Sequence, residues 1–457
     1  MFIGRERELG TLERHYGSGN FELFCIYGRR RVGKTELIKE FIKGKKSIFF
    51  TGVEDTKNVN LADFSSAVME TLHNTKSKAV YADFREAFAD IYEYAKNEKF
   101  VLVIDEFPYL AKSYPGISSL LQIEIDHRLK DTGIFIILCG SSMSFMENQV
   151  MGHKSPLYGR RTGQIKVLSF DYETSKKFCV EGTEEEKAIV YGVTGGIARY
   201  LQLFSNNRGL EENIKGNFFN SDELLFEEPI NLLNQELREP ALYNSIITAV
   251  ATGCTKVYEI ENYTRLDSST CVKYLKNLIE LGIIKREIPV REKATSKKSI
   301  YRLNDGMFRF WYRFVYKNIS KIGLGLGEQV YEEVKGHIPD FMGEVFEKIC
   351  KEYMWKSKLP FSVSEIGRWW GNNPIRKAEQ EIDLIAVNSS NSKAIFCECK
   401  WRNEKTPESV IGGLIGKAGM FGYKEKHYYF FSKGGFTDAA RKCAGENIRL
   451  IEFCDMF

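Results

Sequence analysis

Three runs of apolar residues in the first third of the chain have the length and composition of buried strands. They are Phe21–Tyr27, Val101–Ile104 and Gly133–Leu138, and a stretch with helical spacing, Glu36–Phe41, follows the first of them. Strands that are apolar on both faces are typical of parallel sheets covered by helices. We therefore predict an α/β fold with a parallel sheet for the N-terminal part of the chain.

From about residue 241 the pattern changes to short helices. Tyr243–Ala251, Lys256–Thr264 and Ser268–Leu281 have apolar residues at helical spacing, and two strand-like pieces, Ile283–Val290 and Ser299–Leu303, follow them. The spacing predicts three helices and a β-hairpin. This succession is typical of a winged-helix domain.

The predicted hairpin is basic. From Lys285 to Arg302 it contains seven basic residues and two acidic ones, a local charge of +5. Such a segment can bind the phosphate backbone of DNA without regard to base sequence. A protein-interaction module with a solvated basic turn explains the same charge, so both interpretations stay open.

The last third of the chain begins with an aromatic stretch and ends in a second α/β pattern. Aromatic residues occupy too many successive positions in 305–320 for one exposed face, which favours a buried helix between domains over a base-stacking platform. The glycine-rich piece 322–327 indicates a linker. Beyond it, a helix over Phe341–Tyr353 and strands over Glu381–Val387 and Ala394–Trp401 predict a separate domain.

Composition narrows the class of protein. The 457 residues suffice for several cores, and 65 basic against 61 acidic residues give a net charge of only +4, so a case for nucleic acid rests on local patches. No run of about 18 apolar residues is present, and no signal peptide follows Met1, so we expect a cytoplasmic protein without membrane contact. The ten cysteines lack a ligand framework and are expected to be reduced thiols.

A glycine loop joins the first apolar strand to the helix that follows it. Glycines at both ends allow successive backbone N–H groups to point at an anion, and the N-terminus of the helix adds positive charge. Lys34 would reach the β- and γ-phosphates of ATP, and the Thr35 hydroxyl would hold Mg²⁺. The predicted nucleotide-binding loop consists of Gly28, Arg29, Arg30, Arg31, Val32, Gly33, Lys34 and Thr35.

Polar residues near the ends of the next two strands complete a predicted ATP-hydrolysis site. Ligands bind at the carboxyl ends of strands in open α/β sheets. There, Asp105 would hold Mg²⁺ and Glu106 would orient the attacking water. Ser141 would contact the γ-phosphate or simply form a turn. In a later loop, Arg160 and Arg161 would stabilise charge on the phosphoryl oxygens or form a solvated basic surface.

The order of these motifs resembles an archaeal and bacterial ATPase family related to the AAA+ and STAND ATPases. The resemblance extends over about residues 1–235 and includes the Thr194–Leu201 segment. In that family this last motif lies in a helical lid, which implies a nucleotide-sensing role for Arg199. This chain has Ala198 where the family usually has a proline that contacts adenine.

A second set of charged residues lies in the C-terminal strands. Glu381 and Asp383 alternate along one strand, and Glu398 and Lys400 along the next, so each pair shares a face. Buried strands rarely carry charges unless these are paired or bind a metal. Asp383 and Glu398 would hold a Mg²⁺ that activates water against a phosphodiester, beside Lys400. The alternative is a Glu398–Lys400 salt bridge in an inactive fold.

This second set resembles the PD-(D/E)XK nuclease superfamily. In that comparison Asp383 is the aspartate, Glu398 and Lys400 are the ExK element, and Glu347 is the acid on a helix. No proline precedes Asp383, a departure that the superfamily tolerates. The resemblance implies a restriction-endonuclease-like α/β domain, and the same ATPase family commonly ends in such a domain.

These observations predict a chain of several functional parts. The expected boundaries are 1–170 for the ATPase core, 171–238 for the helical lid, 239–304 for the winged helix, 305–330 for a connecting helix and linker, and 331–457 for the nuclease-like domain. We expect ATP binding to change how the lid and winged helix hold the nuclease-like domain, which gates metal-dependent DNA cleavage, and hydrolysis to reset the switch.

Other functions remain open at this stage. One is a regulatory ATPase whose winged-helix and C-terminal domains bind DNA or a partner protein without cleaving DNA. Another, less favoured because only the ATPase motifs speak for it, is a motor that moves along DNA. An arginine that acts between subunits would require an oligomer, whereas a switch of this class also functions as a monomer.

Overall fold

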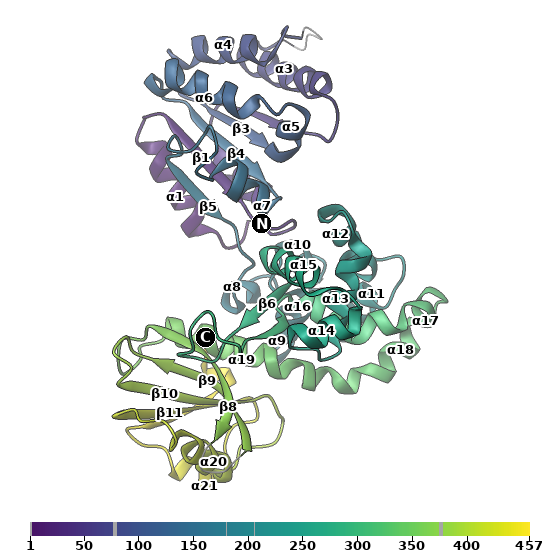
Figure 1. Cartoon of the computed structure of the whole chain (residues 1–457), viewed down its shortest axis with the longest axis vertical. Coiled ribbons are helices and arrows are strands. Elements are labelled where there is room, and N and C mark those ends of the chain that lie inside the picture. The colour runs from purple at the N-terminus through teal and green to yellow at the C-terminus, as the bar shows by residue number, and fades with distance from the viewer. Residues whose placement is uncertain (1, 76–79, 180, 205, 374–377) are drawn as a thin grey trace. The chain divides into compact units, whose positions relative to one another are not determined.

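A five-stranded, all-parallel sheet forms the centre of the N-terminal part of this computed structural model (Figure 1). The structure describes residues 2–75, 80–179, 181–204, 206–373 and 378–457. The strand order is β2-β3-β4-β1-β5, so β4 separates β1 from β3. The strands are β1 (Glu22–Tyr27), β2 (Ser47–Thr51), β3 (Val101–Asp105), β4 (Phe135–Gly140) and β5 (Gly163–Lys166).

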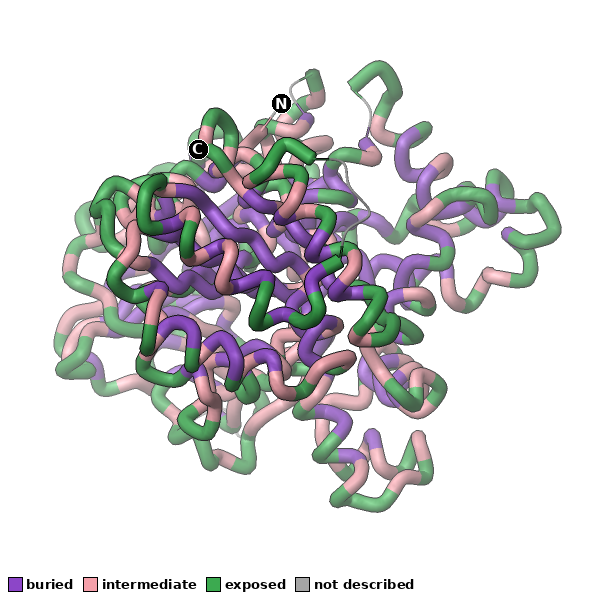
Figure 2. The backbone as a smooth tube through the Cα atoms, turned by 90° about the horizontal axis from the view of Figure 1, so that it is seen from above, coloured by how far each residue is buried: buried purple, intermediate pink, exposed green. Residues whose placement is uncertain are grey.

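Helices cover both faces of this sheet. The helices are α1 (Glu6–Gly17), α2 (Lys34–Ile42), α3 (Lys57–His73), α4 (Phe84–Ala95), α5 (Phe107–Ser113), α6 (Ile117–His127) and the short α7 (Met143–Phe145). Residues of α3 to α6 form one large apolar core with the sheet. On the other face, Tyr16 of α1 and Phe41 of α2 pack against Phe135. Burial on both faces explains why β1, β3 and β4 read as continuous apolar runs, which lie among the buried segments of Figure 2.

The chain divides into two compact units. The first extends to Ser169 and also includes Ile197–Arg199, and the second contains Phe170–Gly196 and Tyr200–Phe457. The second unit begins with the helices α8 (Tyr172–Lys176), α9 (Glu184–Thr194), α10 (Ala198–Leu201), α11 (Leu210–Phe218) and α12 (Leu224–Glu236). The first two residues of α10 belong to the first unit.

Three helices and a two-stranded antiparallel sheet follow in the second unit. They are α13 (Pro240–Ala251), α14 (Val257–Thr264), α15 (Ser268–Glu280), β6 (Ile284–Glu287) and β7 (Ile300–Leu303). This is the succession of elements that the hydrophobic pattern predicts. The loop between the strands packs on the C-terminal sheet, because Val290 is 4% exposed and belongs to the apolar core of that sheet.

The aromatic stretch is helical and buried. It comprises α16 (Gly306–Phe310), a π-helical turn (Trp311–Val315), a 3₁₀ turn (Tyr316–Asn318) and α17 (Ile319–Gly323). Trp311 Nε1 donates to the Phe226 carbonyl of α12 at 2.7 Å, and Tyr312 Oη donates to Asn244 Oδ1 of α13 at 2.5 Å. The expected packing role is confirmed, since the ring of Trp311 is fully buried.

The glycine-rich piece differs from the expected linker. It forms the turn between α17 and α18 (Gly327–Val334). Gly327 packs so closely that a Cβ there would lie 1.8 Å from the carbonyl oxygen of Phe219, the residue that follows α11. Glycine therefore serves close helix packing at this position, and a spacing rule cannot distinguish that use from flexibility.

A mixed five-stranded sheet ends the chain, in the order β12-β11-β10-β9-β8. The strands are β8 (Glu365–Asn373), β9 (Ala378–Val387), β10 (Lys393–Lys400), β11 (Glu425–Ser432) and β12 (Ile448–Glu452), with β8, β9 and β10 antiparallel and β10, β11 and β12 parallel. The long helix α19 (Ile338–Lys356) covers one face, and α20 (Glu408–Ala418) and α21 (Asp438–Lys442) cover the other.

The predicted fold class is confirmed. The chain is a mixed α/β protein with a parallel sheet in its N-terminal part and a separate sheet domain at its C-terminal end. None of the helices in the described part of the chain combines the length and the apolar character needed to cross a bilayer.

Candidate functional sites

The glycine loop lies at the carboxyl end of β1 and leads directly into α2. Gly28 is required by a close approach, because a Cβ at this position would lie 2.3 Å from the Val167 carbonyl oxygen. Gly33 has a φ of 94°, in the left-handed region that glycine tolerates. The N-terminus of α2, which begins at Lys34, presents unpaired N–H groups and a positive dipole end. The loop thus has the backbone geometry of an anion-binding site.

Lys34 and Thr35 both form hydrogen bonds close to the glycine loop. Lys34 is buried, and its Nζ donates to the Gly28 and Arg29 carbonyls at 2.9 and 3.0 Å. Thr35 Oγ1 donates to Asp105 Oδ2 at 3.0 Å, and this hydrogen bond joins the first turn of α2 to the carboxyl end of β3. The two residues predicted to hold Mg²⁺ are therefore together.

Glu106 and Ser141 meet where β3 and β4 end side by side. Ser141 Oγ donates to Glu106 Oε2 at 3.0 Å. Glu106 has a φ of 48°, a conformation that is uncommon for a residue with a side chain and is often retained at functional sites. The structure brings Glu106 and Ser141 into one hydrogen-bonded pair next to Asp105.

The two arginines of the later loop have different surroundings. Arg160 forms a bidentate ion pair with Asp126 of α6, with distances of 2.8 and 2.6 Å. The hydrogen bond from Arg160 lowers the pKa of Asp126. Arg161 lies near β1, where its charge opposes the rise in the pKa that burial causes at Cys25. In the part of the chain that the structure describes, neither guanidinium bonds to Lys34 or Thr35, so their role in phosphoryl transfer stays a prediction.

The segment around Arg199 lies against the glycine loop. The Arg199 backbone N–H donates to the Arg31 carbonyl at 3.1 Å, and the Arg199 side chain is exposed. A Cβ added to Gly33 would lie 3.6 Å from the Ala198 Cβ. Ala198 therefore lies next to the glycine loop. It occupies the position at which the ATPase family described above usually has a proline.

Arg5 supports the glycine loop, and sequence reasoning did not identify it. Its guanidinium donates to the Val32 carbonyl at 3.0 Å and also to the Leu168 carbonyl. Arg5 is 9% exposed, and it has a φ of 104°. The left-handed backbone of Arg5, just before α1, marks this residue as unusual, but the structure alone reveals it.

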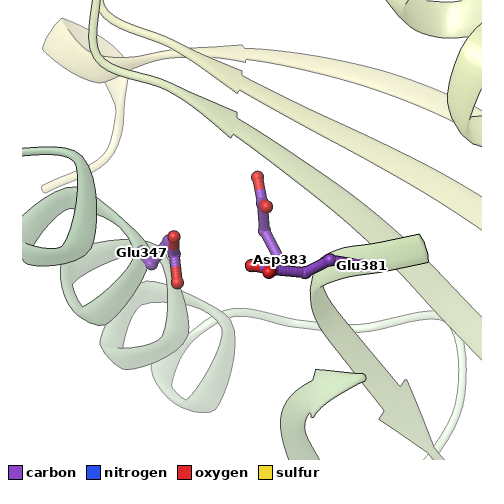
Figure 3. A group of neighbouring side chains, drawn as sticks. All are labelled: Glu347, Glu381 and Asp383. Atoms are coloured by element: carbon purple, nitrogen blue, oxygen red, sulfur yellow. The ribbon is translucent and has the colours of Figure 1, made fainter. Parts of the chain in front are cut away.

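Three carboxylates converge between α19 and β9 in the second unit (Figure 3). Glu347 projects from α19, and Glu381 and Asp383 come from β9. Each offers one oxygen, and these oxygens lie within 4.8 Å of one another. Hard oxygen donors at this spacing suit Mg²⁺ or Mn²⁺. The residues present thus fit a divalent cation, and Glu381, which the sequence places on one face with Asp383, adds a third acid to Asp383 and Glu347.

Burial makes ionisation of these acids more costly than it is in water. Burial, followed by the negative charge of Asp383, raises the pKa of Glu347. Burial, followed by the charge of Glu398, raises the pKa of Asp383, and a 2.7 Å hydrogen bond from the Cys399 N–H opposes this rise. Acids held at such a cost are typical of functional sites.

Glu398 and Lys400 lie beside this group. Lys400 Nζ donates to Glu398 Oε1 at 2.6 Å, and Lys417 of α20 lies 3.5 Å from Glu398 Oε2. The register of β9 and β10 pairs Leu384 with Cys397, so Asp383 and Glu398 are neighbours at the end of the ladder. The structure groups Asp383 with Glu347 and Glu381, and it holds Glu398 in ion pairs.

Arg368 supplies positive charge to the acid group. It lies on β8, its Nε is 3.4 Å from Glu347 Oε2, and its Nη2 donates to Glu381. A guanidinium at two of the three carboxylates occupies part of the space that a cation and its substrate would use. Sequence reasoning missed Arg368 because it did not identify β8.

Two family models match separate parts of the chain. Residues 2–204 match a family model described as an ATPase domain predominantly from Archaea. Residues 311–410, which include Glu347, Glu381, Asp383 and Glu398, match a model of archaeal and bacterial proteins of unknown function.

One relative covers almost the whole chain. An uncharacterised protein of Methanocaldococcus jannaschii is 34% identical over 438 residues, which are 94% of each chain. An uncharacterised ATP-binding protein of the same organism is 52% identical over 46 residues, 10% of this chain and 78% of the relative. Among solved structures, the Aeropyrum pernix ORC2 protein in ADPNP and ADP complexes covers 70% of this chain and 95% of its own, with 15% identity and a TM-score of 0.45.

Proposed function

Because the chain belongs to the family of largely archaeal ATPases that end in a domain of unknown function, we propose that it is an ATP-driven switch that controls metal-dependent cleavage of DNA by its C-terminal domain. The observation that carries this proposal is the convergence of Glu347, Glu381 and Asp383 within 4.8 Å, in a chain that also has an ATPase domain. Two sets of charged residues, each suited to phosphate chemistry, are thus present in one protein.

In the ATPase part, the glycine loop binds the phosphates of ATP. Lys34 exchanges its two carbonyl partners for the β- and γ-phosphate oxygens, and Thr35 and Asp105 hold Mg²⁺. Glu106, oriented by Ser141, positions the attacking water. Arg199, in the helical lid, senses which nucleotide is bound. Arg160 or Arg161 stabilises the transferred phosphoryl group. For Arg160 this role requires that its ion pair with Asp126 breaks.

In the C-terminal part, Glu347, Glu381 and Asp383 hold Mg²⁺, with Glu398 as a further ligand. A bound Mg²⁺ polarises a phosphodiester and lowers the pKa of a coordinated water. Lys400 orients the attacking water and neutralises charge on the phosphate. Arg368, released from the carboxylates, binds the same phosphate, since a guanidinium matches phosphate geometry.

A second candidate function retains the ATPase and omits cleavage. Glu398 is paired with Lys400 and Lys417, and Arg368 pairs with Glu347 and Glu381, so three cations already offset most of the negative charge of the acids without a metal. In that case the second unit binds DNA or a partner protein under the control of ATP. An oligomer is required only if an arginine acts between subunits.

Cleavage assays on the full-length protein separate the two functions. Supercoiled, linear and single-stranded DNA are incubated with Mg²⁺ or Mn²⁺, with and without ATP, and with Asp383→Asn, Lys34→Ala and a Glu446→Gln control. Glu446 is an exposed carboxylate outside the acid group. We expect cleavage that Asp383→Asn abolishes, that Glu446→Gln retains and that no longer responds to ATP in Lys34→Ala. ATP hydrolysis without cleavage of any DNA form would leave the regulatory ATPase as the function.

A further inference from the structure

A cavity of about 500 Å³ lies in the second unit beside the acid group. Its walls come from α19, from β8 and from the two-stranded sheet of β6 and β7. Glu347 and Arg368 both line it, so the cavity opens onto the carboxylates. Segments more than 60 positions apart in the sequence thus build one concave surface, which includes the hairpin of the predicted winged helix.

The hairpin is a fixed wall of this cavity. The Val290 N–H donates to the Arg368 carbonyl of β8 at 2.9 Å, and the Val290 side chain lies in the apolar core of the C-terminal sheet. Trp370 Nε1 donates to the Lys298 carbonyl at 3.1 Å. Burial of the Val290 side chain in this core stabilises the attachment of the hairpin. The basic residues of the hairpin are therefore held next to the acids.

The cavity wall carries cations suited to a phosphate. Lys285 and Arg302 of the hairpin line it together with Lys351 of α19. Arg302 shares Glu344 with Arg309, at 3.2 and 2.8 Å, and Lys285 pairs with Glu287. Lys351 is half-buried, and among the described residues its ammonium group forms no hydrogen bond or close ion pair, although Glu287 and Glu365 of the same cavity attract it over a longer distance. A cavity cation without a bonded partner can form direct hydrogen bonds to an anionic ligand.

Three functional side chains follow one another along α19. Glu347, Lys351 and Trp355 are spaced four residues apart, so they lie on the same face of the helix, with about 6 Å between successive positions. All three line the cavity, and Trp355 is 51% exposed. An acid, a cation and an aromatic ring in this order match a metal-binding position, a phosphate and a base. Cations alternating with aromatic rings are the usual surface for single strands.

The size of the cavity suits one nucleotide. Its volume of about 500 Å³ is that of a small-molecule pocket and not of a channel that holds a whole duplex. Ligand pockets of this volume accept a molecule of nucleotide size. A nucleotide enters it from a strand end, from an unpaired region or after flipping out of a duplex.

We propose that this cavity binds an unpaired nucleotide of a nucleic-acid strand, with its phosphate at Lys351, Lys285 and Arg302 and its base against Trp355. The role of this site in cleavage rests on the proposed function, whereas the binding itself does not. The hairpin then acts as part of the strand-binding site next to Glu347, and the substrates are nucleic acids with unpaired nucleotides.

Binding assays without metal test this proposal. Fluorescence anisotropy of labelled 12-nucleotide single strands, of DNA and of RNA, and of a DNA duplex is measured with the full-length protein in EDTA, where no cleavage occurs. We expect single strands to bind more tightly than a blunt duplex. Lys351→Gln and Trp355→Ala should each weaken this binding about tenfold, because each removes a charge-assisted contact or a stacked base. The DNA and RNA arms identify the sugar that the cavity prefers.

The control is Lys442→Gln, which removes an exposed lysine of α21 outside the cavity. Thermal unfolding checks that each variant is folded. The proposal is wrong if both cavity variants bind single strands as the unaltered protein does, or if a blunt duplex binds as tightly as a single strand. Strand binding that depends on Lys351 and Trp355 in a protein that cuts no DNA would overturn only the nuclease function, and cleavage without this dependence would overturn only the cavity site.

Discussion

The hydroxyl of Thr35 illustrates how a single contact prepares the ATPase site. Its hydrogen bond to Asp105 spans the distance between the first turn of α2 and the end of β3. Both groups are hard oxygen donors, and Mg²⁺ commonly uses one or two such protein ligands together with phosphate oxygens. The pair therefore holds the position that the cation of MgATP would take.

We expect Thr35→Ala to weaken MgATP binding about tenfold, because a ligand to the charged cation is lost. Binding of ATP in EDTA should stay unchanged, since Lys34 and the loop backbone are intact. Calorimetric titrations with and without Mg²⁺ measure both affinities. Thr35→Ser, which keeps the hydroxyl, is the matched control, and an equal loss of affinity in EDTA would contradict the assignment of Thr35 to the cation.

Lys351 offers a second test at a single residue. Burial, followed by the charge of Lys285, lowers its pKa, while Glu287 and Glu365 oppose this change. At neutral pH the folded state therefore bears a desolvation cost that the unfolded chain does not. We expect Lys351→Met to raise the free energy of unfolding by about 1 kcal/mol at pH 7, as is common where a residue is retained for function.

The sign of the pH dependence follows from linkage. Between the lowered pKa of folded Lys351 and about 10.4 in the unfolded chain, the unfolded state binds more protons, so the native protein gains stability as pH rises. The difference in the free energy of unfolding between Lys351→Met and the unaltered protein should therefore become smaller towards pH 10. Urea unfolding at pH 7 and pH 9.5 measures it, with Lys442→Met as the exposed control. A variant less stable than the native protein at pH 7 would show that Lys351 has a structural role.

Individual functional residues were predictable where a motif fixed their spacing. The contacts of Lys34, Thr35 and Asp105 follow from a glycine loop and a strand end. Glu381 and Arg368 were not assigned roles, because their functions depend on which strands are neighbours. Asp126, the ion-pair partner of Arg160, lies 34 positions away in the sequence and belongs to no motif. Spacing could not predict this pair.

At the scale of elements, the hairpin loop attaches the second unit's three-helix region to the C-terminal sheet through Val290. We expect Val290→Asp to cost more than about 2 kcal/mol at this contact, because it places a charge in an apolar core. Loop 288–299 should then be cut rapidly by trypsin at its lysines, while ATP hydrolysis stays unchanged. Val272→Asp, at a position of α15 that is 48% exposed, is the control. Equal trypsin resistance in both variants would contradict a fixed hairpin.

Elements with strong periodicity were predicted well, and an edge strand was not. The helix expected over Phe341–Tyr353 lies within α19, since its apolar residues recur at helical spacing. Strand β8 has only two buried residues, Ile366 and Asn373, and two glycines, so it shows no alternation of polar and apolar positions. An edge strand with half-exposed faces leaves little pattern in a sequence. Without β8, the cavity and Arg368 could not be foreseen.

At the scale of the whole molecule, long-range contacts unite regions that the sequence suggested were separate domains. Tyr191 Oη of α9 donates to Glu352 of α19 at 2.6 Å over 161 positions, and Trp311 reaches Phe226 over 85. These contacts lie within the second unit, which contains α8, α9, α11 and α12, the three-helix region and the C-terminal sheet. Composition and spacing describe local segments, so they cannot reveal which segments share a core.

Two compact units predict two thermal transitions in calorimetry, and ATP distinguishes a switch from an isolated ATPase. Saturating MgATP at about 100 times its Kd should stabilise the first unit by about 2.7 kcal/mol, which raises its Tm by roughly 5–10 °C. If ATP controls the second unit, the coupling free energy also moves the second transition by a smaller amount, and by reciprocity a single-stranded ligand of the second unit tightens ATP binding.

Lys34→Ala should abolish both shifts. Lys39→Ala, an exposed lysine on the same helix, should retain them. A second transition that saturating MgATP leaves in place, together with an ATP affinity that the single strand leaves unchanged, would rule out the switch and leave two independent activities in one chain.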